Sequence, residues 1–181
     1  MHFTSLIIAS AITVKLGSQG TQIDRTLLQT AIDEVLQGPH ASTVIQKTFG
    51  SQADVQKIHR CVQKLVTGKV FIPAADVNEA AGNGVGGATD PQSKHITFSL
   101  GYFSGTTKED SDRRAGTLIH EASHALCGTY DYFDHSNCEP TTLKANNLNG
   151  YANSPDFETF LKTCSENSYL NADSYRMIAM S

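Results

Sequence analysis

The segment His120-Glu121-Ala122-Ser123-His124 holds the residues whose types and spacing could do chemistry. On a helix, two histidines four residues apart lie on one face, about one turn apart, so both imidazoles can bind one metal ion. Glu121 directly follows the first histidine, so its carboxylate can approach a water on that ion without being a ligand. Zinc would lower the pKa of this water, and Glu121 would accept its proton as hydroxide attacks a carbonyl. The pattern therefore predicts zinc-assisted hydrolysis.

A catalytic zinc site has three protein ligands and one open position, so a third ligand must follow. One class of zinc proteases uses a histidine six residues after the second one, but Tyr130 occupies that position. A second class uses a glutamate from a following helix, and Glu139 fits poorly because it lies in a Cys-Glu-Pro loop. Asp131 comes just after Gly128 and Thr129, and a tight turn there can fold its carboxylate back onto the metal. The expected zinc ligands are His120, His124 and Asp131.

Helix signals surround this segment. Leu118, Ala122 and Leu126 can face a core, Asp110 or Ser111 can begin a helix, and Gly128 can end it. Four further helices are expected at 24–37, 51–68 (capped by Ser51), about 155–166 and 171–180. Strands are expected at 70–72 and 94–100, with a glycine-rich loop at 78–91. That loop lacks the Lys-Ser/Thr of a P-loop, so no nucleotide is implied.

Composition excludes several classes of protein. The chain has 181 residues and a net charge of −4, from 14 basic and 18 acidic residues. Its longest basic run is Arg113-Arg114, so we expect no nucleic-acid partner. No apolar run reaches the roughly 18 residues that cross a bilayer, so we expect no membrane partner. We expect a monomer.

Two features favour secretion. Residues 1–20 have the apolar run of a signal or leader segment, although a first strand or helix of the mature chain is the alternative. Residues 21–181 then form a single domain. Four cysteines allow two disulfides in three pairings, which is typical of an oxidising compartment. We expect Cys138 and Cys164 to pair, whereas Cys127 could be a disulfide partner or a metal ligand.

The histidine segment and the residues after it resemble one family. HEASH at 120–124 followed by GTYD at 128–131 is similar to the HExxH and GTxD signature of the aspzincin metallopeptidases. Thr48-Phe49-Gly50 resembles the family's YFG segment, 94–103 resembles the strand before its active helix, and 171–175 resembles its NADSY segment. The similarity spans roughly residues 45–180, and the lysine-specific endopeptidase branch is more similar than the deuterolysins.

The resemblance implies a fold and a mode of substrate binding. It implies an α+β, zincin-like domain that is mostly helical, with a small mixed sheet whose edge strand flanks the active-site helix. A protein or peptide substrate would pair with that edge at Ala88 and Thr89. Asp173 matches an acidic residue that lines the specificity pocket of the lysine-specific branch.

The chain departs from the family pattern at three places. Asp134 stands where the family has a tyrosine that donates to the developing oxyanion, and an ionised carboxylate would repel an oxyanion. Tyr130, Tyr132 or a protonated His135 could take that role. Arg176 stands where the lysine-specific branch has a second acid, which disfavours a lysine side chain. The stretch between Asp134 and Ala172 is also longer than expected and could form a lid or a specificity loop.

Three hypotheses follow. The first is a zinc-dependent endopeptidase in which Glu121 is the general base. The second, prompted by Asp134, is a catalytically impaired zinc protein that binds a peptide or protein partner. The third is a toxin or effector protease that cleaves one protein.

Overall fold

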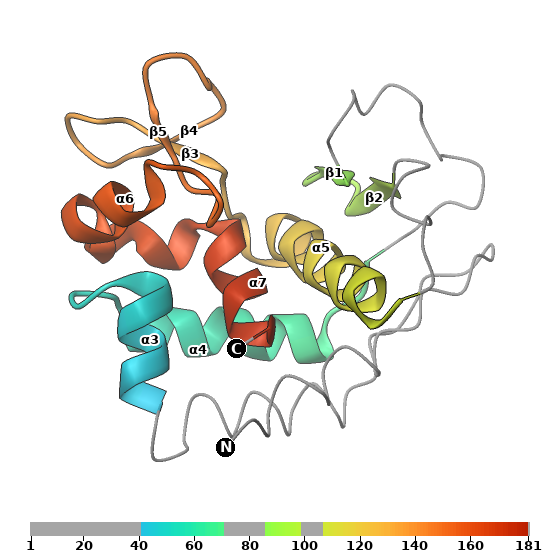
Figure 1. The fold of residues 1–181 in the computed structure, drawn as a ribbon. Helices are drawn as coiled ribbons and strands as arrows, with labels where there is room; N and C mark the ends of the chain where they lie inside the picture. Colours follow the sequence, from blue (N-terminus) through green and yellow to red (C-terminus); the bar gives the residue numbers. More distant parts are fainter. Residues whose placement is uncertain (1–40, 71–85, 99–106, 181) are drawn as a thin grey trace.

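The computed structural model describes residues 41–70, 86–98 and 107–180, which form an α+β fold (Figure 1). Its elements are α3 (Ala41–Phe49), α4 (Val55–Thr67), β1 (Gly87–Asp90), β2 (His95–Phe98), α5 (Lys108–Cys127), β3 (Tyr132–Phe133), β4 (Pro140–Thr141), β5 (Leu148–Asn149), α6 (Phe157–Thr163), the 3-10 helix η2 (Ser165–Leu170) and α7 (Ala172–Met180). The predicted α+β class is confirmed. In place of one mixed sheet, the described strands form a two-stranded sheet and a three-stranded sheet, both antiparallel.

Helix α5 carries the histidine segment and packs against α4, α7 and β1. It begins slightly earlier than predicted, because Thr107 accepts a hydrogen bond from the backbone of Asp110 and the Asp110 side chain accepts one from the backbone of Thr107. Gly128 ends the helix as predicted, in the left-handed conformation with φ 69°. Both ends of the helix are therefore defined by local hydrogen bonds.

The larger hydrophobic cluster lies between α3, α4, α5, α7 and β2. Its largest fully buried side chains are Phe49, Ile58, Ile96, Phe98, Leu118, Ile119 and Tyr175. Fully burying an apolar side chain of this size stabilises a fold by about 1.5–3 kcal/mol. The apolar face of α5 is part of this cluster, which fixes the helix relative to α7.

A smaller hydrophobic cluster lies beneath the three-stranded sheet. It contains Phe133, Leu148, Phe157, Phe160 and Cys164. Strand β3 is central in the order β4-β3-β5, and Phe133 packs on Phe160 with ring centroids 4.5 Å apart. Because β3 begins directly after Asp131, this cluster also anchors the chain that follows α5.

Two disulfides link distant parts of the fold. Cys138 pairs with Cys164, as predicted, and joins the β3–β4 hairpin to the end of α6. Cys61 pairs with Cys127 and joins α4 to the last residue of α5, so Cys127 is not a metal ligand. The disulfides are compatible with an extracellular protein. No helix among the described residues combines the length and the apolar character that a membrane span requires.

Several predicted boundaries are wrong. Helix α4 begins after Asp54, whose carboxylate accepts from the backbone of Lys57 at 3.0 Å, rather than after Ser51. Helix α6 is shorter than predicted, because the chain continues as the 3-10 helix η2. The end of the expected glycine-rich loop is strand β1. Outside the described residues lie the leader at 1–20, the helix at 24–37, residues 71 and 72 of the first strand and most of the glycine loop.

Candidate metal centre

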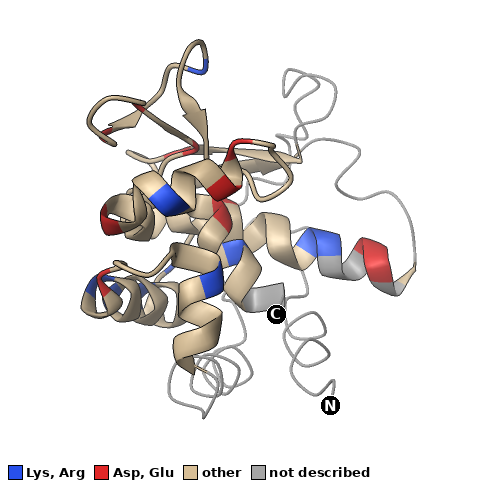
Figure 2. Ribbon diagram, turned by 60° about the vertical axis from the view of Figure 1, so that its left-hand side comes forward, with Lys and Arg blue, Asp and Glu red and all other residues tan. Residues whose placement is uncertain are grey.

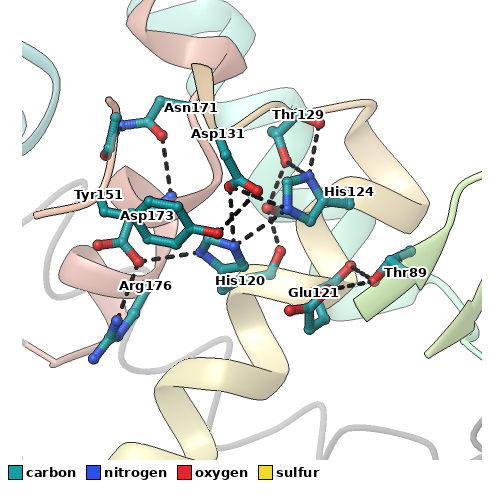
Figure 3. Close-up of polar contacts among 12 residues, drawn as sticks. Thr89, His120, Glu121, His124, Thr129, Asp131, Tyr151, Asn171, Asp173 and Arg176 are labelled. Atoms are coloured by element: carbon teal, nitrogen blue, oxygen red, sulfur yellow. Dashed lines mark hydrogen bonds and ion pairs between the residues drawn. The ribbon is translucent and has the colours of Figure 1, made fainter. Parts of the chain in front are cut away.

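The two histidines of α5 point at each other, as their spacing predicts (Figure 3). Their Nε2 atoms are 3.2 Å apart and their rings are nearly perpendicular. His120 is buried, and His124 is partly buried beside the cleft that lies above the helix. Their Nε2 atoms therefore face the same point at the edge of the protein.

Asp131 reaches this point because the chain turns sharply after α5. Gly128 adopts a left-handed conformation, and the backbone of Tyr130 then pairs with the start of α7 through hydrogen bonds to Leu170 and Ala172. This arrangement brings Asp131 Oδ1 to 3.1 Å from His120 Nε2 and 3.4 Å from His124 Nε2. The helix and the turn thus bring together the three predicted ligands.

The three ligand atoms have the spacing of a metal site. Bonds of about 2.0–2.1 Å at tetrahedral angles separate neighbouring ligand atoms by about 3.3 Å. The three distances here are 3.1, 3.2 and 3.4 Å. In addition, Asp131 Oδ1 is a buried oxygen without a well-formed hydrogen bond to any described residue. His120, His124 and Asp131 form a group that could bind a metal ion.

Hydrogen bonds behind the rings orient both histidines. His120 Nδ1 lies 3.1 Å from Asp173 Oδ1, and His124 Nδ1 lies 2.7 Å from the carbonyl oxygen of Thr129. Each partner oxygen can accept a hydrogen bond from Nδ1–H, which leaves Nε2 available for an ion. The sequence did not indicate this role for Asp173.

The charges in this cluster are strongly coupled. Burial disfavours the imidazolium form of His120, but the adjacent carboxylates of Asp131 and Asp173 outweigh this effect and raise its pKa to about 9. Burial also disfavours ionised Asp131, yet the two histidines lower the pKa of its carboxyl well below the usual range. Without a metal, a proton on His120 balances the acidic charge, and a bound cation would replace that proton.

Asp173 accepts three hydrogen bonds. Its Oδ1 contacts His120 and, at 3.3 Å, Arg176 Nη1, while its Oδ2 accepts from the backbone N–H of Ala152 at 2.7 Å. The side chain is about 1% exposed. A direct contact between Asp173 and substrate stays a prediction, and the contacts described are those of a group that orients His120.

Glu121 lies beside the three ligands but outside their group. Thr89 of β1 donates to Glu121 Oε2 at 2.7 Å and lies 3.0 Å from its carbonyl oxygen. Gly87 allows this approach, because a Cβ atom there would lie 3.0 Å from Glu121 Cγ. Ala88, on the same strand, is exposed and lines the cleft with Thr89. Strand β1 therefore holds Glu121 at the cleft wall.

Tyr151 is a member of the site that sequence reasoning missed. Its hydroxyl donates to Asp131 Oδ2 at 3.0 Å, and its ring stacks on His120 with centroids 5.4 Å apart. Burial and the charge of Asp131 raise its pKa, so the hydroxyl stays protonated and can donate. Tyr151 comes directly after β5 and Gly150, in the stretch that the sequence marks as unusually long. No local pattern links that stretch to the histidines.

The expected oxyanion donors lie in different places. Tyr132 lines the cleft, with its ring centroid 6.3 Å from that of Tyr151, and Tyr130 also lines it. His135 is exposed in the turn between β3 and β4 and is not among the cleft residues. Asp134 stabilises that turn by accepting from the backbone N–H of Ser136 at 2.7 Å. The Asp134 carboxylate is therefore engaged in the turn rather than directed at the cleft.

The cleft has a volume of about 440 Å³ and is bordered by β1, the turn after α5, β3, β4 and Tyr151. His124, Asp131, Glu121 and the exposed part of β1 all line it, whereas His120 lies buried behind them. Compared with protein-family models and with curated proteins, the chain matches none.

Proposed function

We propose that this protein is a secreted, zinc-dependent endopeptidase. The observation that carries the proposal is the triangle of His120 Nε2, His124 Nε2 and Asp131 Oδ1, with sides of 3.1–3.4 Å, next to the Glu121 carboxylate. The aspzincin resemblance, marked by the same three ligands and Glu121, supports it as well.

Zinc fits this donor set better than other common ions. Two imidazoles and one carboxylate with an open position are typical of catalytic zinc sites, whereas structural sites use four protein ligands. Calcium and magnesium prefer oxygen ligands. Zinc held here would supply Lewis acidity, which activates a water and polarises the substrate carbonyl.

Glu121 is the general base of the proposed reaction. Its carboxylate accepts the proton of the attacking water and later transfers it to the leaving amine. Thr89 positions this carboxylate by donating to Oε2, which leaves Oε1 for the proton. Burial of Glu121 at the cleft wall places its charge where bulk water screens it little.

Strand β1 is the proposed docking edge for the peptide backbone. It pairs on one side with β2, and among the described residues no strand pairs with its other side. An extended peptide added there would lie along Ala88 and Thr89, next to Glu121. Tyr151, on the other side of the ligand triangle, would donate to the developing oxyanion, and Tyr132 is the alternative donor.

The substitution Glu121→Gln tests the proposal. It keeps the shape of the side chain and removes the base, so casein hydrolysis should fall by at least about 10²-fold while bound zinc stays stoichiometric. Glu109→Gln is the matched control, because Glu109 lies exposed in the first turn of the same helix. If wild type and variant both carry zinc and both hydrolyse casein at an equal, negligible rate, the result would instead support a catalytically impaired zinc protein that binds a peptide or protein partner.

A further inference from the structure

The cleft takes its walls from two different sheets. Ala88 and Thr89 of β1 belong to one wall, and Tyr132 of β3 with Thr141 and Thr142 at the end of β4 belong to the other. Figure 1 shows the two sheets apart from each other. In strand addition, backbone hydrogen bonds give affinity and the surfaces that meet the side chains give specificity. A peptide paired with β1 would therefore present side chains to the wall from β3 and β4.

That wall carries no charge at neutral pH. Among the described residues that line the cleft, the charged or readily ionised ones are Glu121, His124 and Asp131, all of which belong to the proposed site. A divalent ion there would balance the two carboxylates, and a histidine binds a metal in its neutral form. With the ion bound, no charged group among these residues remains to pair with a charged substrate side chain.

The charged residues that could select a lysine or an acid lie elsewhere. Asp173 and Arg176 line a separate cavity of about 580 Å³ behind the buried ring of His120, and this cavity shares no residue with the cleft. Most Lys and Arg residues of the described chain lie on helices, as Figure 2 shows, and none of them lines the cleft. A charged side chain taken into the cleft would lose water without gaining an oppositely charged partner.

Tyr132 gives the wall from β3 and β4 an apolar surface. Its ring lies edge-to-face with the ring of Tyr151, with centroids 6.3 Å apart, and Tyr151 stacks in turn on His120. These ring contacts hold Tyr132 beside the proposed metal site. Pro91, after β1, adds an uncharged residue to the lining. An aromatic or large aliphatic side chain in the cleft would bury apolar surface against Tyr132.

We propose that the cleft selects substrates with an uncharged aromatic or large aliphatic residue next to the scissile bond, and that Tyr132 recognises this residue, with Thr142 at the rim. This inference rests on the proposed peptidase function and names its substrate class. Lysine, arginine, aspartate and glutamate are disfavoured at this position, because the wall that meets the side chain has no charge to pair with them.

Peptide binding to the Glu121→Gln protein tests the inference without requiring turnover. Alanine-rich peptides with blocked ends and a central Phe, Leu, Ala, Lys or Glu are titrated onto the zinc-loaded protein, and anisotropy reports binding. The Phe and Leu peptides should bind about tenfold or more tightly than the Lys and Glu peptides. The Lys peptide also tests the alternative that the tyrosine rings attract a cation. Equal or tighter binding of the Lys or Glu peptide would overturn the inference, as would a Phe peptide that binds no better than the Ala peptide.

Two variants at position 132 test the apolar surface. Added to the Glu121→Gln protein, Tyr132→Ala should remove most of the preference for the Phe peptide, because it removes the ring. Tyr132→Phe keeps the ring and should keep the preference. Zinc content is measured on both variants. A preference that survives Tyr132→Ala in the zinc-loaded protein would exclude this residue as its source.

Two variants at position 142 test the absence of charge at the rim, where Thr142 is exposed. Thr142→Lys should raise the affinity for the Glu peptide by about two- to fivefold, and Thr142→Asp should do the same for the Lys peptide, as expected for exposed ion pairs. Thr159→Lys is the matched control, because Thr159 is exposed on α6 and lies outside the cleft lining. If neither Thr142 variant differs from the control, the substrate side chain does not meet this wall and the inference fails.

The cleavage profile of the wild-type protein separates this inference from the proposed function. Hydrolysis with an enrichment of aromatic or large aliphatic residues beside the cleaved bond supports both. Hydrolysis without that enrichment overturns the inference and leaves the peptidase proposal standing. Selective binding of the Phe and Leu peptides without any hydrolysis by the wild type supports the assignment of the wall and contradicts the peptidase proposal.

Discussion

At the scale of single residues, the contacts of Tyr151 and Asp134 bear on the proposed reaction. Tyr151, at the end of β5, contacts Asp131 and stacks on His120, so in the proposed reaction it would supply the hydroxyl that the aspzincin pattern has at position 134. Asp134 is then free to stabilise the β3–β4 turn through Ser136. In the proposed reaction, the negative charge of Asp134 would therefore lie away from the developing oxyanion.

Tyr151→Phe should lower kcat by about 10²-fold while zinc content stays unchanged, because it removes one oxyanion donor and no ligand. Steady-state hydrolysis of a chromogenic peptide, with zinc measured on the same sample, checks this. Tyr132→Phe is the matched variant, since Tyr132 lines the same cleft. If Tyr132→Phe loses activity and Tyr151→Phe does not, the donor is Tyr132.

The raised pKa of His120 makes the stability of the metal-free protein depend on pH. Its pKa is 6.5 in the unfolded chain and about 9 in the folded protein. The resulting stabilisation is fully present below pH 6.5 and is lost as pH rises through about 9. We therefore expect the unfolding free energy of the chelator-treated protein, measured with denaturant, to fall as pH rises from 6.5 to about 9.

Two variants control this measurement. His59→Asn changes an exposed histidine on α4 and should keep the fall, whereas His120→Asn should remove it. A fall of equal size in the His120→Asn protein would assign the dependence to another group.

At the scale of elements, the turn after α5 connects helix geometry to the ligand set. Gly128 has φ 69°, and a Cβ atom there would meet no other atom within 4 Å. A substitution at this position therefore acts through backbone conformation rather than through a clash. The positions of the two histidine side chains are set by the helix, whereas the position of the Asp131 side chain is set by this turn.

Gly128→Ala should lower the unfolding free energy by about 1–2 kcal/mol, because alanine disfavours the left-handed conformation. Zinc affinity should fall too, as the turn that presents Asp131 is strained. Gly128→Asn should cost less, since asparagine tolerates this conformation. Denaturant unfolding and competition with a chelator measure the two quantities. Equal losses in both variants would point to a cause other than backbone conformation.

The sequence predicts the elements whose signals are local. The spacing of His120 and His124, the glycine end of α5 and the position of Asp131 after the turn all depend on neighbouring residues, and the structure brings the three ligands together. Tyr151 could not be predicted in this way, because the pairing of β3 with β5 brings it to the site from 20 residues beyond Asp131. The contact between Thr89 and Glu121 is likewise a tertiary one.

At the scale of the whole molecule, the site lies between the two hydrophobic clusters. The larger cluster fixes α5 and its histidines, and the smaller one fixes β3 and, through β5, the chain that carries Tyr151. Each cluster also includes one of the two disulfides. The geometry of the ligand triangle therefore depends on how the two clusters are held together.

Removing either disulfide should lower the free energy of unfolding. The loss should be larger for the disulfide that closes the longer loop. Cys61–Cys127 spans 66 residues and Cys138–Cys164 spans 26 residues. Loop-closure entropy gives upper estimates of about 4.3 and about 3.5 kcal/mol for the two Cys-to-Ser double variants. Denaturant unfolding under oxidising conditions measures both. A larger loss for the shorter loop would show that native packing, rather than the unfolded chain, sets the order.

The origin of the ligands has a further consequence. Two come from the helix of the larger cluster and one from the chain that leads into the smaller cluster, so a single ion would act as a non-covalent cross-link between them. Its removal should loosen the three-stranded sheet more than the helices. Amide hydrogen exchange after chelation should then accelerate first in β3 and β5 and leave α4 protected. Loss of the ion would therefore open the part of the fold around the three-stranded sheet before the whole protein unfolds.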